Sequence, residues 1–219
     1  MRLQSAIFDM DGTLLDSMPT WRELGPTFLK EAGISATPEQ DRMLHILADC
    51  DVIPYLREVC GLPWSQQEII DQIIQRMETF YSSQVRPKPG LEKFLSILKM
   101  EGVWMYVATA THRRLTEKAL KTAGIDHYFR GIVTSADAGN HKSESADIYE
   151  MAMRRLQSNK RDTVVFEDAL HAIETAKAAG FRVCGVYDDS AREDQEAIRR
   201  IADYYITSFE EMFETNVPE

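Results

Sequence analysis

The chain has 219 residues, of which 44% are hydrophobic and 27% are charged, a composition typical of a globular protein with one large domain or two smaller ones. The formal net charge is -10 at pH 7 and the lysines and arginines form no run, which argues against a nucleic-acid partner. No apolar segment reaches the roughly 20 residues that a membrane-spanning helix needs, so we expect no membrane association.

The three cysteines are an odd number and lack the spacing of a metal site. The first residues also lack the basic and then apolar pattern of a secretion signal. Both features favour a reduced, cytoplasmic protein, and we expect a monomer rather than an oligomer.

The first predicted strand, residues 6–8, ends in two acids that stand one residue apart, Asp9 and Asp11. Carboxylates in this position can attack phosphorus, bind a metal ion or cap a turn. Gly12 follows them, and a glycine there lets backbone amides approach an anion closely. Residues elsewhere in the chain are needed to distinguish these three roles.

Residues 17–86 carry amphipathic helical patterns and no convincing strand. The patterns cover residues 21–33, 42–60 and 65–84. We therefore predict an inserted α-helical cap domain at 17–86, between the two parts of a core domain, 1–16 and 87–219. Prolines lie near both joints, and two joints close together are typical of a lid, with rigid packing onto the core as the alternative.

After residue 86, short apolar runs alternate with amphipathic helical patterns. The runs cover residues 103–110, 131–135, 163–168 and 182–187. This alternation predicts an α/β fold with a mostly parallel, doubly wound sheet, whose ligands gather at the carboxyl ends of the strands. Asp9, Thr109 and Asp168 fall at such ends. The acid-rich segment 188–196 is predicted to be a solvated entry to a helix.

Phosphoryl transfer to a carboxylate needs a cation, donors for the phosphoryl oxygens and a proton source. Thr109 offers a hydroxyl and Ala110 a backbone amide at the second strand end. Lys142 supplies a positive charge. Glu167 and Asp168 supply hard oxygens of the kind that Mg²⁺ prefers. The sequence thus contains a candidate for each requirement.

Four segments together resemble the motifs of the haloacid dehalogenase superfamily, in its branch of Mg²⁺-dependent phosphatases and phosphomutases with a small helical cap. They are, in the order and spacing of that family, DMDGTLLDS, VATAT, HKSESADIY and VVFEDALHAIETAKAAG. The resemblance spans nearly the whole chain. It implies a Rossmann-like parallel-sheet core with the α-helical cap inserted after the first strand.

The resemblance also implies roles for individual residues. Asp9 would be the nucleophile that becomes an aspartyl-phosphate, and Asp11 the general acid and base. Gly12, Thr109 and Ala110 would lie against the phosphoryl oxygens.

The same resemblance implies a metal site and a charge that faces it. Asp9, Asp168 and the backbone carbonyl of Asp11 would bind Mg²⁺ directly, and Glu167 would act through a metal-bound water. Lys142 would neutralise the nucleophile and the phosphate.

Lys142 departs from the pattern of the family in one respect. It stands five residues before Asp147, where the family usually has four, and the prolines common in that loop are absent. A bulge in the loop can absorb one residue. Lys142 stays the predicted cation because His141 cannot supply a permanent charge.

The predicted function is that of a cytoplasmic Mg²⁺-dependent phosphatase that hydrolyses a small phosphorylated metabolite, such as a sugar phosphate. A β-phosphoglucomutase-like phosphomutase is the alternative, but it needs cap cations that grip a second phosphate, and no such pattern is evident at 17–86. Asp11 disfavours a dehalogenase. The lack of a well-placed cap lysine disfavours phosphonate cleavage, and the complete set of reactive residues disfavours a non-catalytic binding module.

Overall fold

The computed structural model describes residues 3–47 and 49–214. The chain divides into two compact units, a core unit formed by Met1–Asp16 and Val85–Glu219, and a cap unit formed by Ser17–Gln84. The cap unit therefore ends two residues before the end of the insertion expected from the sequence. None of the helices in the described residues combines the length and the apolar character that crossing a membrane requires.

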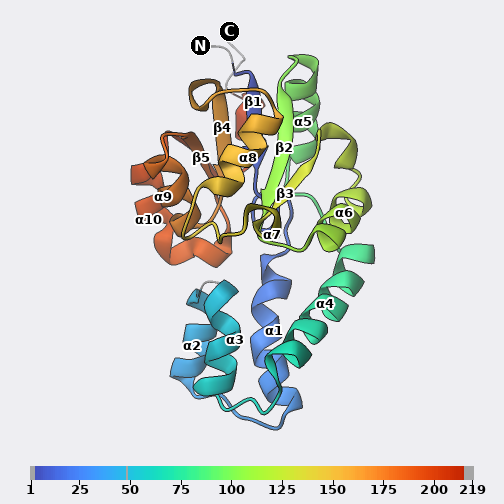
Figure 1. Cartoon of the computed structure of the whole chain (residues 1–219), viewed down its shortest axis with the longest axis vertical. Helices are drawn as coiled ribbons and strands as arrows, with labels where there is room; N and C mark the ends of the chain where they lie inside the picture. Colours follow the sequence, from blue (N-terminus) through green and yellow to red (C-terminus); the bar gives the residue numbers. More distant parts are fainter. Residues whose placement is uncertain (1–2, 48, 215–219) are drawn as a thin grey trace. The chain divides into compact units, whose positions relative to one another are not determined.

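The core unit contains a six-stranded sheet in which every pair of neighbouring strands is parallel (Figure 1). Its order is β3-β2-β1-β4-β5-β6. The strands are β1 (Ser5–Phe8), β2 (Trp104–Thr109), β3 (Ile132–Thr134), β4 (Thr163–Glu167), β5 (Arg182–Val186) and β6 (Tyr204–Ile206). The predicted α/β class is confirmed. The edge strand β6 was not predicted, because three residues are too few for a period-two pattern to stand out.

Each face of the sheet carries its own apolar layer. On one face Ile7 and Val165 belong to a buried cluster with Ile148 and Ile173, from helices α8 and α9. On the other face Phe8 stacks on Phe166 of the neighbouring strand, with ring centroids 4.4 Å apart. A sheet covered on both faces explains why its central strands are apolar at successive positions.

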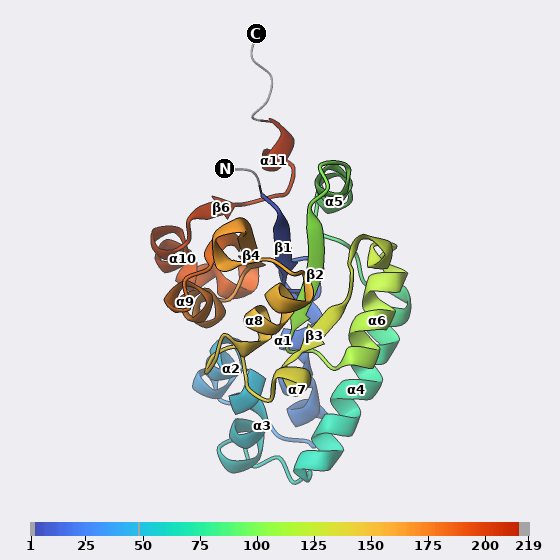
Figure 2. The same ribbon diagram turned by 45° about the horizontal axis from the view of Figure 1, so that its top comes forward.

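Helices and 3₁₀ turns connect the strands, and Figure 2, in which the top of Figure 1 comes forward, labels the helices of the core unit and β6. The helices of the core unit are α5 (Leu91–Met100), α6 (Arg113–Thr122), α7 (Ser135–Ala138), α8 (Asp147–Arg155), α9 (Leu170–Ala178), α10 (Gln195–Ile201) and α11 (Glu211–Glu214). The 3₁₀ turns are η1 (Asp126–Tyr128), η2 (Lys160–Asp162) and η3 (Asp189–Asp194). Helix α8 packs on β1, β2 and β3, and α9 packs on β4 and β5.

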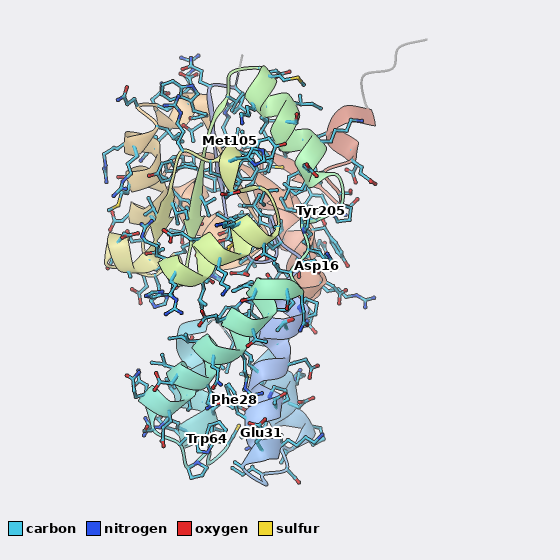
Figure 3. The ribbon with its side chains drawn as sticks, turned by 90° about the vertical axis from the view of Figure 1, so that its right-hand side faces the viewer. Asp16, Phe28, Glu31, Trp64, Met105 and Tyr205 are labelled. Carbon is cyan, nitrogen blue, oxygen red and sulfur yellow. The ribbon has the colours of Figure 1, made fainter. Side chains whose placement is uncertain are left out.

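In the described residues of the cap unit the regular secondary structure is α-helical, and turns and loops join the helices. Its helices are α1 (Met18–Glu31), α2 (Pro38–Ile46), α3 (Asp49–Glu58) and α4 (Gln66–Ser83). The single pattern expected at 42–60 is therefore divided between two helices. Capping boxes at Thr37 and Ser65 begin α2 and α4. Inside the unit the rings of Phe28 and Trp64 lie 5.5 Å apart (Figure 3).

The two chain segments that leave the core unit run side by side. Asp16 N–H donates to Arg86 O at 3.0 Å, and Lys88 N–H donates to Leu14 O at 2.9 Å. We call residues 14–16 and 86–88 the connecting ribbon. Its two strands are hydrogen-bonded at the point where the cap unit is inserted.

Candidate active site

The carboxyl ends of β1 and β4 bring three buried acids together. Asp9 follows β1, Glu167 ends β4 and Asp168 comes next. The strands are parallel and in register, and Asp9 N–H donates to Phe166 O at 3.0 Å, so these ends lie at the same level. One carboxylate oxygen from each acid lies within 4.8 Å of the others.

Lys142 reaches this group from the loop between α7 and α8. Its ammonium donates to Asp9 Oδ1 and, at 2.6 Å, to Glu167 Oε1. The loop forms a turn in which the amides of Glu144 and Ser145 both donate to His141 O, at 3.0 and 3.1 Å. In this turn the His141 side chain is exposed while Lys142 is buried.

Asp11 lies beside the buried group without belonging to it. Its carboxylate accepts a hydrogen bond from Thr111 Oγ1 at 2.7 Å. The intervening turn is tight, with Gly12 at φ 83°, a left-handed conformation that glycine adopts without strain. The Gly12 N–H donates to Leu15 O at 3.0 Å and so closes this turn.

The end of β2 presents the second set of expected groups. Thr109 is buried, and its hydroxyl oxygen accepts the Thr111 N–H at 3.1 Å. A hydroxyl that accepts one hydrogen bond still has its own proton to donate. Ala110 follows as a half-buried residue. Since β2 is the direct neighbour of β1, these groups lie at the strand end next to Asp9.

Four protein donors contact the Glu167 carboxylate. Oε1 receives hydrogen bonds from Lys142 Nζ at 2.6 Å and from Tyr149 Oη at 2.9 Å. Oε2 receives the N–H groups of Asp168 at 3.0 Å and Ala169 at 3.2 Å. The side chain is therefore fixed by four contacts.

Burial and mutual repulsion set the protonation of these acids. Burial raises the pKa of Asp168 well above its ordinary value, and the charges of Glu167 and Asp9 raise it further. Burial also raises the pKa of Asp9, although the Lys142 ammonium opposes the shift. For Glu167 burial is outweighed by Lys142 and by the hydrogen bonds, so its pKa is lowered. Lys142 has a raised pKa despite burial because Asp9 and Glu167 attract its proton.

This donor set fits a divalent metal ion. Asp9, Glu167 and Asp168 offer hard oxygens, the ligands preferred by ions such as Mg²⁺. Three buried carboxylates share one ammonium, Lys142, and a divalent cation would offset the remaining negative charge. Asp168 is held for such a role by Thr13, whose hydroxyl donates to its Oδ1 at 2.7 Å.

Sequence reasoning missed four contributors to this edge of the sheet. Thr13, Thr111 and Tyr149 lie within or beside the motif segments, so their positions were visible but their partners were not. Asp188 belongs to the segment expected to be solvated, and for this residue the expectation was wrong. It is buried, and Lys88 Nζ donates to its Oδ2 at 2.5 Å.

Comparison with known families identifies the chain. A family model described as haloacid dehalogenase-like hydrolase matches residues 6–186. The chain belongs to this family of enzymes. The predicted resemblance is confirmed, and the match covers the whole cap unit, most of the core unit and every site residue that the sequence predicted.

Curated relatives of similar length carry named activities. A phosphorylated carbohydrates phosphatase from Thermotoga maritima is 26% identical over 185 residues, which cover 84% of this chain and 85% of the relative. Hexitol phosphatase B from Escherichia coli (strain K12) is 26% identical over 217 residues, covering 96% and 95%. A fructose-1-phosphate phosphatase from the same strain is 26% identical over 184 residues, covering 82% and 94%.

Solved structures share the fold at lower identity. CbbY from Rhodobacter sphaeroides, solved in complex with phosphate, superposes with a TM-score of 0.81 at 23% identity and covers 96% of each chain. A β-phosphoglucomutase from Clostridium difficile gives a TM-score of 0.74 at 19% identity, covering 98% of this chain and 95% of its own. At this level of identity the likeness describes the fold alone.

Proposed function

We propose that this enzyme is a Mg²⁺-dependent phosphatase that acts on small phosphorylated sugars through an aspartyl-phosphate on Asp9. The observation that carries the proposal is the arrangement around Asp9. Lys142 contacts its carboxylate, Asp168 lies within 4.8 Å of it, and Asp11 stands one residue away with its carboxylate outside the buried group. A nucleophile, a cation and a separate proton donor are what phosphoryl transfer to a carboxylate requires.

The proposed reaction has two half-reactions. In the first, an Asp9 oxygen bonds to phosphorus while the bond from phosphorus to the sugar oxygen breaks, and that oxygen takes the proton of Asp11. In the second, Asp11 takes a proton from water as the water oxygen bonds to phosphorus, and the bond from phosphorus to the Asp9 oxygen breaks. The products are inorganic phosphate and a free Asp9 carboxylate.

The surrounding residues bind and orient the phosphoryl group. Lys142 lowers the repulsion between the Asp9 carboxylate and the incoming phosphate, and the Thr109 hydroxyl and Ala110 amide donate to phosphoryl oxygens. Asp9, Asp168 and the Asp11 carbonyl would hold Mg²⁺, which when bound neutralises charge on the transferring group.

A sugar phosphate is the substrate class that the relatives favour. The three named relatives act on phosphorylated carbohydrates, on hexitol phosphates and on fructose 1-phosphate, according to their names. Their common feature is a phosphate monoester on a small polyhydroxylated carbon chain. We propose this class of compounds, and not one particular sugar, as the substrates of this enzyme.

A phosphomutase is the second candidate, since a β-phosphoglucomutase shares the fold. A mutase has to hold a second phosphate with cations of the cap. Two of the cap cations are paired with cap acids, Arg76 with Glu31 at 2.7 Å and Arg42 with Glu39 at 3.0 Å. This pairing favours hydrolysis.

The proposal is tested by measuring phosphate release from a panel of hexose, pentose and hexitol phosphates with Mg²⁺. We expect several substrates to be hydrolysed, and Asp9→Asn to lower kcat by at least about 1,000-fold because an amide cannot form the phosphoenzyme. Asp126→Asn, an exposed substitution on η1, is the matched control. Near wild-type activity of Asp9→Asn would remove Asp9 as the nucleophile.

The same preparation distinguishes the mutase. With β-glucose 1-phosphate and a trace of bisphosphate primer, we expect inorganic phosphate to form much faster than glucose 6-phosphate. Fast isomerisation with negligible phosphate release would replace the phosphatase with the mutase.

A further inference from the structure

Tyr149 donates into the candidate site from the first turn of α8. Its side chain is fully buried, and its hydroxyl donates to Glu167 Oε1 at 2.9 Å. The same oxygen accepts from Lys142 Nζ at 2.6 Å. Tyr149 and Lys142 are therefore joined through one carboxylate oxygen.

Two further contacts hold the Glu167 carboxylate in place. A carboxylate offers about four acceptor positions in all. Protein donors fill two on Oε1 and two on Oε2, the latter through the amides of Asp168 and Ala169. These contacts make Glu167 an anchor between the end of β4 and Lys142.

We propose that Tyr149 is a positioning residue that, through Glu167, holds the Lys142 ammonium against Asp9. This inference rests on the proposed phosphatase function and deepens it. Two backbone amides donate to Oε2 of Glu167 and fix that side of the carboxylate. Its Oε1 accepts hydrogen bonds from both the Tyr149 hydroxyl and the Lys142 ammonium. The hydroxyl sets the orientation of that oxygen, and the oxygen sets the position of the ammonium.

The loop that carries Lys142 explains why such support matters in this chain. Lys142 stands at the start of a turn without prolines, and a lysine side chain has about 2 kcal/mol of rotamer entropy to lose when it is held in place. The backbone of the loop therefore does little to fix the ammonium. Contacts to the ammonium itself have to hold it in place. Asp9 is not a constant partner, because its carboxylate changes its charge when it bonds to phosphorus. Glu167 is the partner that stays constant.

The hydroxyl can be removed with little disturbance of its surroundings. The ring of Tyr149 packs edge-on against Phe181 at 6.2 Å between centroids and lies in the buried cluster under the sheet. Phenylalanine keeps these contacts and removes one oxygen. Tyr106→Phe is the matched control, because Tyr106 is also a buried tyrosine of the core unit and its hydroxyl contacts Arg155 at 3.4 Å, away from the acids.

The first test compares kcat, KM and Mg²⁺ binding by calorimetry without substrate. We expect Tyr149→Phe to lower kcat by about 5- to 20-fold, the effect of one hydrogen bond to a charged group. KM and the Mg²⁺ dissociation constant should stay within about 3-fold, and Tyr106→Phe should match the wild type. An unchanged kcat would overturn the proposal, as would a loss of Mg²⁺ affinity that accounts for the loss of kcat.

The second test asks whether the effect passes through Lys142. In a Lys142→Ala background, Tyr149→Phe should change kcat for p-nitrophenyl phosphate by less than about 2-fold, because there is no ammonium left to position. The full loss in both backgrounds would show that Tyr149 acts by another route. If Tyr149→Phe does not fold, Glu167→Gln is the second variant. We expect it to cause the same loss of kcat when Lys142 is present and no loss in the Lys142→Ala background. If the wild type has no Asp9-dependent activity at all, the proposed function fails instead.

Discussion

Asp11 differs from the other acids of the site in its surroundings. It is half-buried and accepts a hydrogen bond from the Thr111 hydroxyl at 2.7 Å, whereas the three other acids form a buried group around Lys142. An acid that stands outside this group can exchange a proton with an alcohol or a water without breaking a contact to the lysine. Its surroundings therefore suit the proposed acid and base, as those of Asp9 suit the nucleophile.

Replacing Asp11 by Asn should have an effect that depends on the leaving group. We expect single-turnover phosphoryl transfer from a sugar phosphate to slow by about 100-fold or more, because an alkoxide needs a proton as it leaves. Transfer from p-nitrophenyl phosphate should slow by about 10-fold or less, since nitrophenolate leaves without one. Rapid-quench assays of both substrates measure this difference. Equal losses on the two would count against Asp11 as the acid.

At the scale of elements, the connecting ribbon is tied to β5 by a buried ion pair. Lys88 Nζ donates to Asp188 Oδ2 at 2.5 Å and to Tyr187 O at 3.1 Å, and the two charged side chains are 13% and 5% exposed. Asp188 Oδ1 also accepts the Ser190 N–H at 2.8 Å at the start of η3. The pair thus joins the place where the cap unit is inserted to the sheet edge that carries the acids.

Removing one partner of this ion pair should destabilise the protein, and removing the second partner as well should restore part of the lost stability. We expect Lys88→Met to lower the free energy of unfolding by about 3 kcal/mol, because it leaves a buried carboxylate without its cation. Adding Asp188→Asn should recover a large part of that loss, since Asn can still accept the Ser190 N–H. Urea unfolding of the wild type, both single variants and the double variant gives the coupling energy. Additive losses would show that the pair is not coupled.

At the scale of the whole molecule, the sequence predicted the parts of the structure that depend on local pattern. Asp9, Thr109 and Asp168 could be placed at one edge because parallel strands align their carboxyl ends. The two helices within 42–60 could not be separated, since their apolar spacing continues across the break. The pairing of Lys88 with Asp188 spans 100 residues, and no local pattern carries such a contact.

For the candidate site too, the sequence predicted individual residues but not the contacts between them. The motif resemblance could name Lys142 in spite of its shifted position, because a charge near the start of a helix is visible in the sequence. It could not give the number of donors around Glu167, which depends on how Tyr149 and two amides converge in space. The role expected of Glu167 toward a metal-bound water stays a prediction.

The whole chain carries a formal charge of -10, and part of that charge is concentrated at one buried edge. Asp168 has a raised pKa because of burial and then because of Glu167, Asp9 and Asp188. A group whose pKa is raised on folding contributes stability at low pH, and this contribution is lost as the pH rises above its unfolded value of about 4. Without metal, the raised pKa of Asp168 therefore makes the protein less stable at neutral pH than it would be with a neutral side chain at this position.

Asp168→Asn should therefore stabilise the metal-free protein while it removes the response to Mg²⁺. Asn keeps an oxygen for the Thr13 hydroxyl and carries no charge, so in EDTA we expect a higher Tm than that of the wild type at neutral pH, with the difference vanishing near about pH 4. Adding Mg²⁺ should raise the Tm of the wild type by mass action and leave that of the variant nearly unchanged. Asp126→Asn, an exposed substitution, controls for the loss of one negative charge from the surface. A metal-free variant less stable than the wild type at neutral pH would contradict the repulsion argument, and an equal Mg²⁺ response in both proteins would remove Asp168 from the metal site.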